Sequence, residues 1–408
     1  MSGEAVEAQV VAAQVAAAVR KIAPGGGESP VPLHAPVFGG NEWSYVKQCL
    51  DTGWVSSAGS YVALFERRLA EYTGVKYAVA VNSGTAALHA ALLVAGVSAG
   101  DEVLLPALTF VATANAVSYC GAVPHFIDSE ERSLGPDPAK LSDYLRQTAY
   151  VGEGGCVNKF TGRRITAVIA MHTFGHPADL DAIREICLQF GLALVEDAAE
   201  ALGSFYKGSH VGAHGLLSAL SFNGNKIVTT GGGGAILTNE LPLALKARHL
   251  TTTAKLEHRW AYEHDAVGFN YRMPNLNAAI GCAQLEQLPR FLENKRELLS
   301  KYEQALAGVR GVRMFREPDY ARSNYWLQAL LLDKADRSTR DLILQRTNDA
   351  GFMTRPSWTL LHKLPMYSSN PRMDLSNAED LESRIVNLPS SASMLPLRGQ
   401  RSEGGGHR

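Results

Sequence analysis

The sequence predicts an α/β protein that has a large domain built on a mostly parallel sheet and a smaller α+β domain. Short apolar runs of strand length alternate with helical segments up to about residue 250, a pattern typical of βαβ units and of a sheet covered on both faces. From about residue 275 a long charged helix precedes strands, another helix and loops. A chain of 408 residues also forms two domains more often than one.

The N-terminal part is expected to be a helix at about 5–22, in which acidic residues come first and Arg20 and Lys21 come last. That order suits a helix macrodipole and is the reverse of a signal peptide. The division that we expect has four parts, which are an N-terminal helix and linker (1–30), the large domain (31–250), the small domain (251–400) and a disordered tail (401–408).

The elements of the large domain follow from local patterns. Helical spacing predicts helices near 41–51, which Asn41 could cap, and at 59–74, which ends on a glycine. Segment 129–164 is expected to be a surface excursion. Alternating strands and helices are predicted in three segments, 76–97, 101–128 and 164–204, and two strands joined by a polar turn and a glycine run are predicted in 218–239.

The first element expected in the small domain is the long helix at 275–308. Strands are predicted near 311–316 and 325–332, and a second helix at 337–350. This order lacks the regular alternation of the large domain and therefore indicates an α+β unit.

Charge and cysteine content exclude several classes of protein. The net charge is −1, from 39 basic and 40 acidic side chains, so no overall field favours nucleic acid or a membrane surface. No uninterrupted apolar run of about 18 residues suggests a transmembrane span. No cysteine pair has metal-ligand or redox spacing, which favours a reduced, cytoplasmic protein. The five cysteines are Cys49, Cys120, Cys156, Cys187 and Cys282.

Polar groups follow three of the predicted strands, and the carboxyl ends of strands are where α/β sheets bind ligands. Ser83-Gly84-Thr85 opens a helix, where free backbone N–H groups and the helix dipole attract an anion such as phosphate. Asp197 ends a buried strand and needs a partner. Lys226 lies in the turn after Ser221, and a lysine that is partly desolvated becomes a nucleophile suited to Schiff-base formation.

Each of these groups also has an ordinary structural explanation. Serine and threonine are common N-caps, a buried carboxylate is often part of a salt bridge, and a turn lysine is usually solvated. Together, however, they are the parts that hold pyridoxal phosphate. Lys226 would bond its aldehyde, Asp197 would keep its ring nitrogen protonated, and the remaining group would hold its phosphate, namely Ser83, Gly84, Thr85 and Ser221.

The sequence segments that contain these residues, and their order, resemble those of the sugar aminotransferases of the DegT/DnrJ/EryC1/StrS family. Members of that family have the aspartate-aminotransferase-like fold, fold type I. The resemblance covers roughly 33–395 and implies a large domain with a mostly parallel seven-stranded sheet. The strings that carry it are NSGTAALHAAL, PALTFVATANAV, VEDAAEALGS, SFNGNKIVTTGGGGAILTN and FNYRMPNLNAAIGCAQLEQL.

The resemblance also implies roles for individual residues. Phe110 would stack on the cofactor ring, Asp197 would pair with its nitrogen, and Lys226 would be the Schiff-base lysine. Glu200 would lie near the ring hydroxyl, where many relatives have glutamine. Asn270 would reach the cofactor phosphate of the neighbouring subunit, which makes the active unit a homodimer.

Other candidates are less specific. His172 is a candidate lining residue near the cofactor, and Tyr325, Trp326 and Trp358 are candidates for a sugar or nucleotide surface, with burial in the small domain as the alternative. A zinc site at His172 and His176 is disfavoured because Gly175 and Pro177 interrupt a helix, so no metal is expected. Gly232 stands where many relatives have glutamate.

The sequence therefore predicts a homodimeric, pyridoxal-phosphate-dependent aminotransferase that moves the amino group of L-glutamate to C4 of a nucleotide-linked 4-keto-6-deoxy sugar for a surface glycan. Two segments resemble one branch of the family, the legionaminic-acid and bacillosamine branch, whose substrate is a UDP-linked 2-acetamido sugar. They are PLHAPVFGGNEWSYV and the GNK around Lys226. GDP-4-keto-6-deoxymannose is the alternative substrate. A cofactor-dependent dehydratase is disfavoured because such enzymes replace the lysine with histidine. A non-catalytic regulatory protein with this fold is the alternative from a different class.

Overall fold

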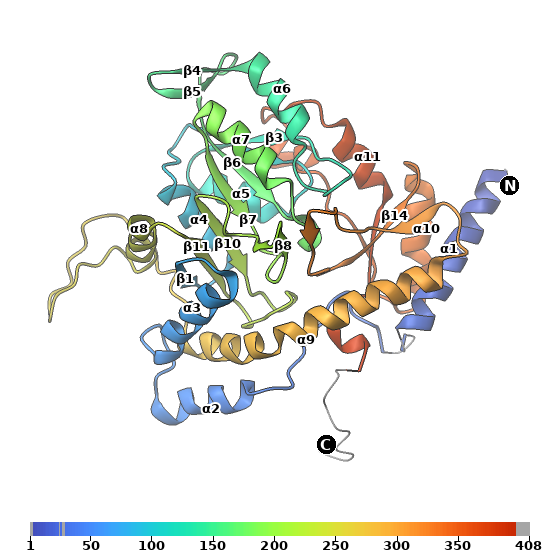
Figure 1. The fold of residues 1–408 in the computed structure, drawn as a ribbon, viewed down its shortest axis with the longest axis horizontal. Coiled ribbons are helices and arrows are strands. Elements are labelled where there is room, and N and C mark those ends of the chain that lie inside the picture. Colours follow the sequence, from blue (N-terminus) through green and yellow to red (C-terminus); the bar gives the residue numbers. More distant parts are fainter. Residues whose placement is uncertain (1–2, 24, 27–28, 397–408) are drawn as a thin grey trace.

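The computed structural model describes residues 3–23, 25–26 and 29–396. A large twisted sheet lies near the middle of the molecule with helices packed around it, and a long helix, α9, runs past one end of that sheet toward a smaller sheet (Figure 1). The expected tail at 401–408 lies outside the described residues.

The large sheet contains seven strands in the order β1-β11-β10-β7-β6-β2-β3. Four neighbouring pairs are parallel, and β11 is antiparallel to both of its neighbours. The predicted mostly parallel seven-stranded sheet is therefore confirmed. Its strands are β1 (Tyr77–Val81), β2 (Glu102–Pro106), β3 (Val123–Ile127), β6 (Arg164–Met171), β7 (Ala193–Asp197), β10 (Leu217–Ser221) and β11 (Gly234–Thr238).

Segment 129–164, expected to be a surface excursion, contains regular elements that were not predicted. Helix α6 (Pro138–Thr148) lies there, followed by a hairpin of β4 (Ala149–Gly152) and β5 (Gly155–Asn158) that pairs with β6 and brings the sheet to nine strands. The sequence contained the signal for this helix, since Asp137 caps it by accepting the Lys140 N–H at 3.0 Å and a proline follows at the first helical position.

The helices beside the sheet bury one face or, when other elements cover them on several sides, most of their surface. Most of α4 is buried, because alanine and leucine let it pack closely between strands and neighbouring helices. The segment over 41–51 forms α2, but Asn41 does not cap it, because its side-chain amide donates to Glu286 at 2.8 Å. These helices are α2 (Glu42–Thr52), α3 (Ser60–Thr73), α4 (Gly84–Val94), α5 (Val111–Tyr119), α7 (Leu180–Phe190) and α8 (Leu241–Thr251).

The C-terminal part is built on an antiparallel four-stranded sheet in the order β12-β14-β16-β15. A separate three-stranded sheet, β13-β8-β9, connects the segment after β7 to this part of the chain. The elements are β8 (Phe205–Tyr206), β9 (Ser209–His210), β12 (Val312–Met314), β13 (Ala321–Arg322), β14 (Gln328–Leu332), β15 (Arg355–Pro356), β16 (Ile385–Leu388), α10 (Arg337–Asp349) and α11 (Ser376–Arg384), with short 3₁₀ helices at Thr173–Gly175, Leu361–Lys363, Pro365–Tyr367 and Ala392–Met394.

Helix α9 (Asn275–Leu306) joins two hydrophobic clusters. Its first half contributes Cys282 and Leu288 to the core of the large sheet, and its second half contributes Leu299 and Tyr302 to a second cluster. Helix α1 (Gly3–Ile22) packs into that second cluster beside α10, as predicted for a helix at the N-terminus (Figure 1). The domain boundaries at 30, 250 and 400 stay predictions. No helix within the described residues is both long and apolar enough to cross a membrane.

Candidate active site

One cavity of about 280 Å³ lies where β1, β7 and β10 end. It brings together residues from both parts of the chain, because two tryptophans from beyond α9 close one side of it. Predicted site residues that line it are Ser83, Gly84, Thr85, Phe110, Asp197, Glu200, Ser221, Lys226 and Trp326.

The expected phosphate-binding group lies at the N-terminus of α4. Ser83 caps this helix by accepting the Ala86 N–H at 3.1 Å. Gly84 is required by crowding, since a Cβ there would lie 2.7 Å from the Cβ of Ser221. The hydroxyls of Thr85 and Ser221 therefore lie beside the positive end of a helix dipole, which is a suitable place for an anion.

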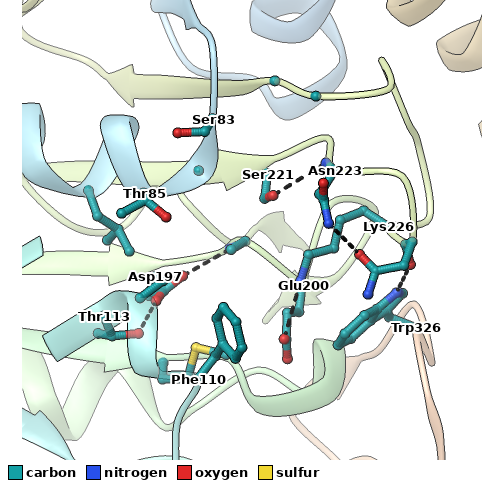
Figure 2. Close-up of a pocket in the computed structure, with 18 of the residues that line it drawn as sticks. Ser83, Thr85, Phe110, Thr113, Asp197, Glu200, Ser221, Asn223, Lys226 and Trp326 are labelled. Atoms are coloured by element: carbon teal, nitrogen blue, oxygen red, sulfur yellow. Dashed lines mark hydrogen bonds and ion pairs between the residues drawn. The ribbon is translucent and has the colours of Figure 1, made fainter. Parts of the chain in front are cut away.

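Asp197 lies on the cavity wall and is only 2% exposed (Figure 2). Its carboxylate accepts two hydrogen bonds from neutral donors, the Thr113 hydroxyl at 2.7 Å and the Ala199 N–H at 3.2 Å. Burial raises the pKa of this carboxyl, and the hydrogen bond from Thr113 opposes the rise. A buried carboxylate held only by neutral groups is suited to a cationic guest such as a protonated ring nitrogen.

Lys226 is not a solvated turn lysine, since its side chain is only 13% exposed. It extends from the turn after β10 toward Glu200, and Trp326 lies beside it (Figure 2). The Nζ atom lies 3.3 Å from Glu200 Oε1 and 4.0 Å from the centroid of the Trp326 ring. The ammonium is thus held by a carboxylate and by an aromatic face at once.

Glu200 is 3% exposed, and burial raises the pKa of its carboxyl to about 7 despite the opposing charge of Lys226. Its second oxygen accepts the Phe174 N–H at 2.9 Å. Near neutral pH this carboxyl can therefore lose or gain a proton, which a glutamine at the same position could not do.

The structure places His172 and Tyr325 outside the cavity lining, and for Tyr325 it favours the alternative of burial in the C-terminal part. His172 is fully buried, with Nε2 3.0 Å from Glu196 Oε2 and Nδ1 accepting the Ala178 N–H at 3.2 Å. The Tyr325 hydroxyl accepts a backbone N–H at 3.2 Å, and its ring packs within the second hydrophobic cluster. Both side chains have their polar atoms occupied elsewhere.

Asn270 is exposed and does not line the cavity of its own chain. Its backbone oxygen accepts from the Asn82 side chain at 3.3 Å, which fixes the segment beside the phosphate turn. The role predicted for Asn270 in a neighbouring subunit stays a prediction.

Several lining residues were not predicted. Thr113 lies in the first turn of α5, three residues after Phe110, so the helical start in PALTFVATANAV contained the signal that both side chains could face one cavity. Trp358, a candidate from the sequence, does line the cavity, and its ring packs against Phe174 with centroids 4.8 Å apart. Asn223 and Asn225, which were not predicted, precede the lysine in the same loop and line the cavity.

Gly232 and Gly233 of the glycine run 231–234 line the cavity, and at three positions of the run the structure explains why glycine is needed. Gly231 has φ +79°, Gly233 has no room beside Thr230, and Gly234 has none beside the Ser83 backbone. A Cβ at Gly232 would meet nothing closer than 4.0 Å, so nothing in the structure explains why glycine stands there.

Comparison with known proteins identifies the family. The sequence profile of the DegT/DnrJ/EryC1/StrS aminotransferase family matches residues 37–399. GDP-perosamine synthase of Escherichia coli O157:H7 is 38% identical over 364 residues, which cover 89% of this chain and 94% of that protein. The putative pyridoxal phosphate-dependent aminotransferase EpsN of Bacillus subtilis is 39% identical over 370 residues, covering 89% of this chain and 91% of that one.

Among solved structures, the aminotransferase TlmJ from Streptoalloteichus hindustanus superimposes with a TM-score of 0.80 at 31% identity and covers 89% of this chain and 94% of its own. The cavity also fits the cofactor of this family, since it offers an anion site, a buried carboxylate and a lysine amine on its walls. The resemblance seen in the sequence is confirmed, and the chain belongs to the DegT/DnrJ/EryC1/StrS family of pyridoxal-phosphate-dependent sugar aminotransferases.

Proposed function

We propose that this enzyme transfers the amino group of L-glutamate to C4 of a nucleotide-linked 4-keto-6-deoxy sugar in surface-glycan biosynthesis. The observation that carries the reaction is the convergence of Lys226, Asp197 and the phosphate turn on one cavity. The sugar we favour is GDP-4-keto-6-deoxymannose, because a relative that matches at 38% over 94% of its own length is a GDP-perosamine synthase. The UDP-linked 2-acetamido sugar, favoured by the early strings of the sequence, is the competing substrate.

The residues that line the cavity would hold the cofactor and tune its chemistry. Bound pyridoxal phosphate supplies an aldehyde that carries the amino group and a ring that withdraws electrons from the reacting carbon. Asp197 holds a proton at the ring nitrogen, and Thr113 fixes the carboxylate that does so. Thr85 and Ser221 hold the phosphate at the start of α4.

Lys226 is the proposed nucleophile and proton carrier. Its Nζ lies beside Glu200 and Trp326, and the side chain lines the cavity. The amine could therefore bond to the cofactor when no substrate is bound, and could hold or release a proton once substrate displaces it. Glu200 stabilises the ammonium at 3.3 Å and excludes bulk water from it together with the tryptophan ring.

A homodimer with shared sites is part of the proposal. Segment 252–269 extends away from the body of the chain beyond α8, and Trp260, Tyr262 and Val267 on it are 74%, 82% and 86% exposed (Figure 1). Large apolar side chains exposed together favour burial against a partner. Asn270 follows this segment directly, so a second copy that covers it would also receive Asn270.

We also propose a cytoplasmic enzyme. All five cysteines are buried free thiols, as a reducing compartment favours.

A single-turnover experiment tests the substrate. The enzyme is loaded with L-glutamate, freed of amino acid, divided, and given either GDP-4-keto-6-deoxymannose or UDP-2-acetamido-4-keto-2,6-dideoxyglucose. Mass spectrometry should find the aminated GDP sugar, with return of the original visible absorbance. Product only from the UDP sugar would refute the GDP assignment, and failure to bind pyridoxal phosphate at all would favour the non-catalytic alternative.

A further inference from the structure

A buried asparagine outside the cavity, Asn324, contacts the two segments that carry Glu200 and Trp326, the neighbours of the Lys226 amine. Asn324 is 1% exposed, and its amide donates to the backbone oxygens of Glu200 at 2.8 Å and Leu202 at 3.0 Å. Its side-chain oxygen accepts the backbone N–H of Trp326 at 2.8 Å. One amide thus joins the segment of the carboxylate to the segment of the tryptophan.

The surrounding chain is shaped around this amide. The backbone N–H of Asn324 donates to Ser204 Oγ at 2.9 Å, and that hydroxyl donates to Gly175 O at 2.6 Å. Gly175 has φ +95°, and a Cβ there would lie 1.9 Å from the Asn324 side-chain oxygen. Glycine at this position is therefore necessary for the asparagine to fit.

Strained backbone adjoins the same contacts. Tyr325, which separates Asn324 from Trp326, has φ +48°, and Phe174, whose N–H holds the Glu200 carboxylate, has φ +54°. Such conformations cost on the order of 1–3 kcal/mol each for residues other than glycine and persist where the surroundings fix them. The strain lies beside the lysine amine rather than at a distant turn.

We propose that Asn324 is a positioning residue that holds Glu200 and Trp326 at fixed distances from the Lys226 amine. The carboxylate and the ring come from segments more than 100 residues apart, and β7, which precedes Glu200, lies in a different sheet from β14, which follows Trp326. The attraction between the Lys226 ammonium and the Glu200 carboxylate, 3.3 Å apart, weakens as their separation grows. A less well positioned Glu200 would therefore alter proton transfer at the amine. The inference rests on the proposed role of Lys226.

The test compares the holoenzyme with its Asn324→Ala variant at saturating pyridoxal phosphate. The pH midpoint of the visible absorbance should shift by at least about half a pH unit, a threefold change in proton affinity. The kcat should fall by about 10- to 100-fold while KM for L-glutamate changes little. Ser204→Ala, a milder variant, should move the midpoint in the same direction by a smaller amount.

Asn294→Ala is the matched control. Asn294 is also buried and donates to two backbone oxygens, Ala392 O at 2.9 Å and Leu395 O at 3.2 Å, but it lies outside the cavity. Its loss should lower stability without moving the midpoint. Equal shifts in both asparagine variants, or none in either, would overturn the proposal.

A double variant separates the two partners. In a Glu200→Gln background the carboxyl no longer titrates, so adding Asn324→Ala should leave the midpoint unchanged. A shift that persists there would show that the asparagine does not act through Glu200. Covalent binding of the cofactor by Lys226→Ala would refute the proposed function itself, whereas an unmoved midpoint in Asn324→Ala with an inactive Lys226→Ala refutes only the positioning role.

Discussion

The two ends of the cavity are built in different ways. At the phosphate end the wall is largely backbone, with Ser83-Gly84-Thr85 opening α4 beside the glycine run 231–234. At the lysine end the wall is made of side chains, in which Lys226 contacts Glu200 and Trp326. Close packing determines which residues fit at the phosphate end, and buried charges determine the chemistry at the lysine end. Substitutions at the two ends should therefore impair the enzyme for different reasons.

The largest contrast is between the lysine and a phosphate hydroxyl. Lys226→Ala removes both the covalent bond and the proton carrier, and the proton transfer alone is worth about 10²–10⁴ in rate. Ser221→Ala removes one hydrogen bond to a charged group, worth about 1.5–3 kcal/mol. Steady-state kcat should therefore be lost in the first variant and retained, with weaker cofactor binding, in the second. Equal losses in kcat would contradict these roles.

The glycine run offers a smaller contrast within the phosphate end. A Cβ at Gly234 would lie 2.4 Å from Ser83 O and 2.7 Å from Gly84 N, so Gly234→Ala forces backbone apart and should cost about 1–3 kcal/mol or more. Gly232→Ala meets open space and should change stability by less than about 1 kcal/mol.

Urea denaturation measures both free energies of unfolding, and titration with pyridoxal phosphate measures the effect on the site. Weak cofactor binding is expected for Gly234→Ala alone. A large loss of stability in Gly232→Ala would show that the space beside Asn82 is filled in solution.

The difference between the two ends of the cavity also explains which site residues could be predicted from the sequence. The turn Ser83-Gly84-Thr85, the strand end at Asp197 and the turn at Lys226 are local patterns, and each was predicted in its element. Helix α6 was missed although Asp137 and the following proline marked its start, because the glycines of the segment suggested only a surface excursion.

The lysine end could be predicted only in part. Asn324, Trp326 and Trp358 reach the cavity or its wall through contacts across more than 100 residues, and periodicity holds no information on such contacts. His172 illustrates the converse, since it directly follows β6, whereas its ring is held by Glu196 away from the cavity. A strand end places a residue near a site, but the face on which its side chain lies depends on register and on partners.

Two buried glutamates near the end of β7 give the last and smallest contrast. Glu196 accepts hydrogen bonds from His172 and from three backbone N–H groups, and the pKa of its carboxyl falls to about 2, although burial alone would raise it. Glu200 has fewer donors, and burial raises the pKa of its carboxyl to about 7. The first is suited to stay charged and the second to change charge near neutral pH.

Glu200 should therefore make stability depend on pH. Its pKa is higher in the folded protein than in the unfolded chain, so the folded state binds more protons between about pH 4.5 and 7, and the free energy of unfolding falls as pH rises through that window. In cofactor-free protein, the stability of the wild type relative to Glu200→Gln should fall by about 2 kcal/mol between pH 5 and pH 8, measured by urea denaturation. For Glu196→Gln the difference from wild type should stay constant over the same range, because the Glu196 carboxyl remains ionised throughout it. A flat difference for Glu200→Gln would show that this carboxyl is already charged at pH 5, and would leave the lysine with a permanent counter-ion instead of a group that exchanges protons.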